Sequence, residues 1–244
     1  MDKLLNITQA SEMLGISPDT LRRWDEKGKI KSIRIKRGEY EYRYYNQDEI
    51  SQLLIDKDIF KTAKDWAASL EPDSPLSFYY CPNVSVFNGR LTKLETALMK
   101  NSKFFPVSSL LVLMAGEIGN NSFDHNLGNW PDVPGVYFAY NLNKRVIVLA
   151  DRGQGILKTL SRAKPDLVSH EEALKTAFTE FISGRIPEKR GNGLKLVKRI
   201  ILKHNFKLYF QTGNAFFNLK GGDTELDIKT GKEYYQGCIA KIEF

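Results

Sequence analysis

The spacing of apolar and polar residues near the N-terminus predicts a helix-turn-helix followed by a β-hairpin. Apolar residues recur at helical spacing in residues 8–14 and again in 18–26, and the turn between them reads Gly-Ile-Ser. Two short helices joined by such a tight turn are typical of a helix-turn-helix. Residues 29–45 alternate around Gly38, which predicts a hairpin, and residues 48–55 predict a last short helix.

The helical pattern over residues 108–126 combines an apolar side with a stripe of three polar residues. Glu117, Asn121 and His125 are four residues apart and therefore lie along one face. Burying such groups without partners costs several kcal/mol, so the stripe is either solvated or used for binding. Elsewhere the pattern predicts strands over 145–150, 207–220 and 236–244, a strand or hairpin within 77–87, and helices over 89–100 and 194–204.

Length and composition bound the class of protein. A chain of 244 residues, 42% hydrophobic and 27% charged, can bury a core, and its length suggests a small module joined to a mid-sized one. Two cysteines are too few for a disulfide scaffold or a cysteine-rich zinc site. The most apolar run, residues 107–115, is about half of what a bilayer requires, and the N-terminus lacks a signal peptide. We therefore expect a soluble cytoplasmic protein without a membrane partner.

Positive charge is concentrated in the predicted helix-turn-helix and hairpin. The chain has 36 basic and 29 acidic residues, a net charge of +7. Residues 22–43 alone contain nine basic and four acidic residues, a local excess of five. This placement indicates double-stranded DNA as the partner.

The residues over 4–55 resemble the winged DNA-binding domain of MerR-type regulators and phage excisionases. The resemblance is carried by Ile7-Thr8, Ala10, residues 14–17, 20–24 and 28–30, and Arg43-Tyr44-Tyr45. It implies that the second helix enters the major groove while the wing contacts phosphates. The residues expected at the DNA are Thr20, Arg22 and Arg23 on the helix, with Asp19, and Lys36, Arg37 and Arg43 on the wing. A winged helix that binds protein is the alternative.

Two glycine-rich segments follow the polar stripe. Asp151 ends an apolar strand and precedes Arg-Gly-Gln-Gly-Ile, a loop that lets backbone approach a ligand. Residues 190–194, Arg-Gly-Asn-Gly-Leu, open a helix, an arrangement suited to phosphate. Each segment alone is a weak match, but the three in this order resemble the N, G1 and G2 boxes of the GHKL ATPases, which include gyrase, a heat-shock chaperone, histidine kinases and MutL. A P-loop lysine motif and a dinucleotide fingerprint are absent from the sequence.

This second resemblance covers about residues 80–244 and implies a Bergerat-type α/β sandwich, a mixed sheet with helices on one face, so the expected fold class is α+β. It implies ATP and Mg²⁺ as ligands. Asn121 would bind the metal, Glu117 would act as general base, and Asp151 would accept the adenine amino group. The other residues implied at the nucleotide are His125, Gly153, Gly155, Ile156, Arg190, Gly191, Gly193 and Leu194.

Residues 157–190 correspond to the mobile ATP lid of that family. The basic end of the segment, Arg185, Lys189 and Arg190, either reaches the γ-phosphate or is a solvated loop. The predicted organisation is a MerR-like winged helix over 1–55, a connector helix over 56–75 and a GHKL-type domain over 76–244.

The combination predicts an ATP-responsive, sequence-specific DNA-binding regulator. Nucleotide binding or slow hydrolysis would change DNA binding or assembly, with a homodimer as one arrangement. A serine/threonine-type switch kinase of the anti-sigma kind, acting on a small regulatory protein, is the alternative. A DNA-processing ATPase resembling gyrase or MutL is a second alternative, although the sequence shows no transducer or cleavage domain.

Overall fold

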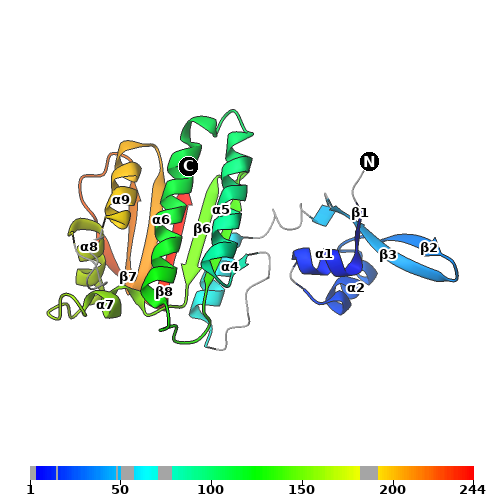
Figure 1. Ribbon diagram of the computed structural model, residues 1–244, viewed down its shortest axis with the longest axis horizontal. Helices are drawn as coiled ribbons and strands as arrows, with labels where there is room; N and C mark the ends of the chain where they lie inside the picture. Colours follow the sequence, from blue (N-terminus) through cyan, green and yellow to red (C-terminus); the bar gives the residue numbers. More distant parts are fainter. Residues whose placement is uncertain (1–3, 15, 48, 51–57, 71–78, 182–191) are drawn as a thin grey trace. The chain divides into compact units, whose positions relative to one another are not determined.

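The computed structural model describes residues 4–14, 16–47, 49–50, 58–70, 79–181 and 192–244. These residues divide into two units, coloured along the sequence in Figure 1. One unit comprises the described residues of Met1–Asp58 and Ser74–Tyr80, and the other those of Ile59–Asp73 and Cys81–Phe244. We call them the winged domain and the sheet domain.

In the winged domain, two short helices accompany a three-stranded antiparallel sheet. The helices are α1 (Ile7–Leu14) and α2 (Pro18–Glu26), and the sheet has the order β1-β3-β2, with β1 at Leu4–Asn6, β2 at Ile33–Arg37 and β3 at Tyr40–Asn46. The hydroxyl of Ser17 caps α2 by accepting a hydrogen bond from the Thr20 amide at 3.1 Å. The predicted helix over 48–55 lies mostly outside the described residues.

The sheet domain is built on five strands in the order β4-β5-β6-β8-β7. Their bounds are Tyr80–Cys81, Val136–Asn141, Val146–Asp151, Ile228–Glu243 and Lys207–Lys220 in that order. The pairs β5–β6, β6–β8 and β7–β8 are all antiparallel, so no parallel pair occurs among these four strands. The α+β class is confirmed, whereas the parallel pairing of a mixed sheet is not found among them.

Helices cover one face of this sheet (Figure 1). They are α5 (Val84–Met99), α6 (Ser108–Asn126), α8 (His170–Thr179) and α9 (Gly193–Lys203), with the one-turn helix η1 (Phe105–Val107) before α6 and α7 (Gly155–Leu160) after β6. Alternate strand residues turn toward the helices and form the core. Phe138, for example, meets Phe87 of α5 with ring centroids 5.2 Å apart.

A further helix, α4 (Ile59–Ala68), packs on the opposite face of the sheet. Tyr137, the strand neighbour of Phe138, donates a hydrogen bond from its hydroxyl to the Ile59 carbonyl at 3.0 Å and stacks on Trp66. The segment that the sequence assigns to a connector is therefore part of the sheet domain. The expectation of helices on one face only is wrong for α4.

Two other segments differ from the sequence-based expectation. Residues 84–87 were expected in a strand or hairpin, but they form the first turn of α5 because Asn83 caps it, its side chain accepting from the Val86 amide at 3.0 Å. The expected lid segment contains α8, whose Phe178 is 1% exposed and packs edge-on against Phe210 and Phe217. This helix of the expected lid segment therefore packs into the core.

Candidate functional site

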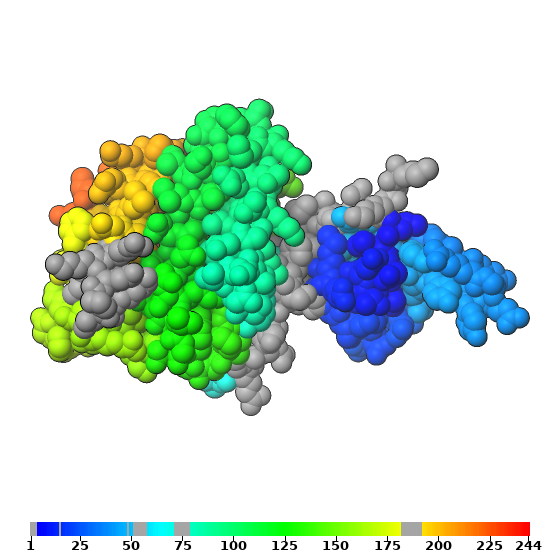
Figure 2. Space-filling view, in the orientation of Figure 1, coloured from blue at the N-terminus to red at the C-terminus, as the bar shows by residue number. Residues whose placement is uncertain are grey.

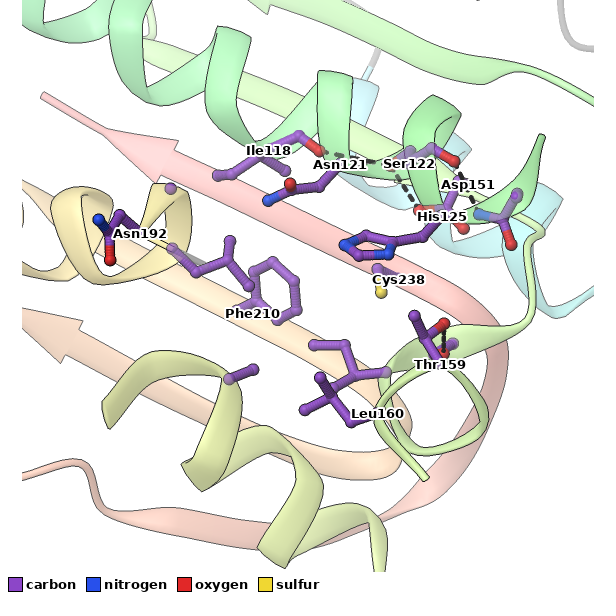
Figure 3. A pocket seen from close by; sticks show the side chains of 16 residues that line it. Ile118, Asn121, Ser122, His125, Asp151, Thr159, Leu160, Asn192, Phe210 and Cys238 are labelled. Atoms are coloured by element: carbon purple, nitrogen blue, oxygen red, sulfur yellow. Dashed lines mark hydrogen bonds between the residues drawn. The ribbon is translucent and has the colours of Figure 1, made fainter. Parts of the chain in front are cut away.

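The three segments singled out in the sequence surround one pocket of the sheet domain (Figure 3). The pocket encloses about 790 Å³ of empty space, part of which is open to solvent. It lies between α6, the end of β6 with α7, and the start of α9. The predicted residues that line it are Asn121, His125, Asp151, Gly155, Ile156, Gly193 and Leu194.

Asp151 is the buried acid of the pocket, with 3% of its surface exposed. Its carboxylate accepts hydrogen bonds from the Ser122 hydroxyl at 2.7 Å and from the Gly153 amide at 2.8 Å. Burial raises the pKa of this carboxyl, while the bonds from Ser122, Gly153 and the Cys238 amide oppose the rise. The group is therefore held in one orientation and can accept a further hydrogen bond from a ligand.

The polar stripe of α6 divides between the pocket and its border. Asn121 and His125 extend from the helix over the pocket in Figure 3. Glu117 is half-buried outside the lining, at the contact between α6 and α9. A Cβ at Gly193 would collide with its Oε2 atom, so this glycine lets the start of α9 approach Glu117.

The glycines after Asp151 permit close packing of the loop. Gly155 has φ +73°, and a Cβ there would lie 2.7 Å from the Gln236 carbonyl oxygen. A Cβ at Gly153, which is not among the lining residues, would collide with the side chain of Asn126. That side chain accepts a hydrogen bond from the Gln154 amide at 2.7 Å, which fixes the loop to α6.

Arg190 and Gly191, together with Arg185 and Lys189 of the expected lid, lie outside the described residues. Asn192 is the first described residue after them, and it lines the pocket as the residue before α9.

Sequence reasoning missed most of the pocket wall. The additional lining residues are Ile118, Ser122, Asn126, Thr159, Leu160, Ala177, Phe210 and Cys238. Cys238 lies on β8, and burial beside Asp151 raises the pKa of its thiol well above the usual range. Ser122 had a detectable signal, since it follows Asn121 on α6, but the bond to Asp151 joins residues 29 positions apart.

The candidate DNA-binding residues of α2 are exposed, apart from half-buried Thr20. Arg22 pairs with Asp19 in the preceding turn. Arg23 donates to the Thr20 hydroxyl at 3.2 Å. Both arginines are thus on the surface and held by partners that are themselves at the helix surface.

The hairpin formed by β2 and β3 has two different faces. Lys36 lies on the face with Arg34, opposite Glu41, whereas Arg37 lies on the other face with its guanidinium 5.6 Å from the Tyr44 ring. Arg43 is half-buried because its Nε donates to Asp25 of α2 at 3.2 Å. The three wing residues expected at phosphates therefore differ in position, and Arg43 has a structural partner.

Comparison with known families identifies the winged domain. Residues 6–45 match the family described as MerR family regulatory protein. The winged domain contains a MerR-type helix-turn-helix. This domain implies DNA as a partner and a role as a DNA-binding regulator. No curated protein matches the chain in sequence.

Two further observations concern membranes and metals. Within the described ranges, no helix has the length and apolar character to cross a membrane. The same ranges contain no group of three His, Cys, Asp or Glu side chains able to hold a metal ion by themselves.

Proposed function

We propose that the sheet domain binds an adenine nucleotide in the pocket around Asp151 and thereby modulates the DNA binding of the winged domain. The observation that carries the proposal is the convergence of three distant segments on one pocket with a buried carboxylate. The pocket combines that acceptor with apolar walls, including Ile118, Leu160 and Phe210. A flat base with an exocyclic amino group fits such a lining.

The polar rim of the pocket fits the remainder of a nucleotide. Asn121 offers an amide oxygen, and the start of α9 directs backbone N–H groups toward the space beside Asn192 and Gly193. Bound Mg²⁺ would neutralise phosphate charge, and Asn121 would be its ligand from this chain. A single amide suits a metal held chiefly by phosphate and water.

Glu117 lies where it could act as general base in hydrolysis or transfer of the γ-phosphate of the bound nucleotide. Its half-buried carboxylate lies beside Gly193, and its role would be to accept a proton from water or from a hydroxyl group. Transfer to a partner's serine or threonine, as in a switch kinase, uses the same carboxylate. The fate of the γ-phosphate decides between hydrolysis, transfer and binding alone.

The test is thermal unfolding of the full chain with and without ATP and Mg²⁺. At ATP a hundred times its Kd, the nucleotide should stabilise the sheet domain by about 2.7 kcal/mol. Asp151→Asn should remove most of this shift because the acceptor facing the base is altered. Asp124→Asn, on the exposed side of α6, is the matched control and should keep it. Equal shifts in wild type and Asp151→Asn, or none in wild type, would refute the proposed site.

Two measurements then define the function. With γ-labelled ATP, label released as phosphate means hydrolysis, label on another protein means a kinase, and retained label means binding only. Selection of duplex DNA sites with and without ATP tests the coupling. Identical affinity in both conditions would separate the nucleotide site from DNA regulation.

A further inference from the structure

The excess positive charge of the whole chain belongs to the sheet domain. Residues 1–58 contain eleven basic and eleven acidic residues, because seven acidic and two basic residues outside 22–43 cancel the excess of five within that stretch. Residues 59–244 contain 25 basic and 18 acidic residues, which accounts for the net charge of +7. Within them, residues 189–222 include eight basic residues and no acidic one.

The helix α9, at the domain surface (gold in Figure 2), carries four of these eight basic residues, Lys195, Lys198, Arg199 and Lys203. Val197, Ile200 and Ile201 are its buried residues and pack into the core. At 100° per residue, Lys198, Arg199 and Lys203 fall on the side opposite to these three. Arg199 and Lys203 are exposed and Lys198 is half-buried. Half-buried Leu196 and Leu202 lie beside them, so the outer side of α9 carries three cations and no acidic residue.

We call Lys198, Arg199 and Lys203 the α9 basic surface. Exposed Lys207, at the start of β7, does not belong to it. Its ammonium lies toward Glu243, which pairs with Lys241 on the sheet face that α4 covers.

Little negative charge compensates this surface. Lys198, Arg199 and Lys203 form no ion pair with any carboxylate in the described part of the chain. Lys195 is set apart, because its ammonium points to the Ala177 carbonyl at the end of α8.

We propose that the α9 basic surface is a second DNA contact, which binds the phosphate backbone of duplex outside the site read by the winged domain. The winged domain delivers duplex DNA to this chain through its local positive charge, and the net positive charge of the sheet domain adds to the long-range attraction. Three cations of one helix, none of them in an ion pair within the described residues, complement closely spaced phosphates without reading bases. This contact is independent of the nucleotide pocket.

The experiment compares two triple variants of the full chain without nucleotide, using a 40-base-pair duplex of mixed sequence. The first variant combines Lys198→Ala, Arg199→Ala and Lys203→Ala. Its slope of log affinity against log salt concentration should be smaller than that of wild type by about 2–3, because each lost phosphate contact removes about 0.9 from the slope. The control is Lys93→Ala, Lys100→Ala and Lys103→Ala, which removes the same charge from exposed positions on and after α5. Its slope should stay near that of wild type.

Three outcomes would overturn the proposal. An unchanged slope in the α9 variant shows that these cations do not contact DNA, and equal changes in both variants show a general charge effect. Loss of binding to polyglutamate with DNA binding intact would assign the surface to an acidic protein. Alanine favours helix, and an unchanged melting temperature verifies that α9 is intact. The ATP-induced melting shift, measured in parallel, reports on the nucleotide pocket alone.

Discussion

The nucleotide pocket and the DNA-binding helix hold their candidate residues in opposite ways. In the pocket, Asp151 is 3% exposed and its carboxylate is oriented by Ser122 and the loop backbone. On α2, Arg22 and its partner Asp19 have side chains 45% and 80% exposed. An exposed ion pair contributes at most about 1 kcal/mol, so Arg22 can exchange Asp19 for a phosphate at small cost.

Because of this difference, substitutions in the two regions should have different effects on folding stability and on ligand binding. A substitution in the pocket disturbs packed neighbours and should change the folding of the sheet domain together with ligand binding. A substitution on the outer surface of α2 or the wing should change DNA affinity and leave folding nearly intact. Gly155→Ala and Asp25→Asn test that division, because each is compared with a variant at an exposed position.

Gly155→Ala should have the largest effect, lowering the free energy of unfolding of the sheet domain by about 3 kcal/mol. Alanine at φ +73° costs about 1–2 kcal/mol, and its Cβ would lie 2.7 Å from the Gln236 carbonyl oxygen, which is backbone and cannot swing away. Urea denaturation of the full chain measures the loss. Gly128→Ala is the control, because Gly128 has φ +71° but no atom within 4 Å of an added Cβ. A similar loss in both variants would show that the loop is not tightly packed.

The helix-turn-helix and the polar stripe could be predicted from sequence because their signals are local. The Ser17 cap defines the start of α2, and the four-residue spacing brings Asn121 and His125 to one pocket. The pocket wall could not be predicted in the same way, since Cys238 reaches Asp151 only through the pairing of β6 with β8. Periodicity likewise predicts that α4 is amphipathic without saying which surface it covers.

Asp25→Asn should lower the stability of the winged domain by about 2 kcal/mol at neutral pH. Asp25 accepts from the Ser32 amide and hydroxyl at 2.9 and 2.6 Å, and from Arg34 and Arg43 at 3.3 and 3.2 Å. Hydrogen bonds to a charged group contribute about 1.5–3 kcal/mol. Hydrogen exchange of the α1 and α2 amides measures the loss. Asp19→Asn, at an exposed carboxylate of the same helix, should change exchange by less than a quarter as much.

Acid should remove the same contribution of Asp25. Burial alone would raise the pKa of this carboxyl, but the Ser32 hydrogen bonds and the charges of Arg34 and Arg43 hold it below its usual range. A lowered pKa means that the stabilisation is complete above the unfolded-state pKa and is lost as pH falls through the folded-state pKa. Wild type and Asp25→Asn should therefore converge in stability in strong acid. A constant difference between them at all pH values would contradict the role of the charge.

The smallest effect should distinguish the two faces of the wing. Lys36 shares its face with Arg34 and Arg43, which both contact α2, whereas neighbouring Arg37 lies on the other face against Tyr44. If the α2 side of the wing faces the DNA, Lys36→Ala should reduce the slope of log affinity against log salt by about 0.9, and Arg37→Ala should change it less. Stability should be unchanged in both, because both side chains are exposed. A larger change for Arg37→Ala would assign the aromatic face of the wing to the DNA.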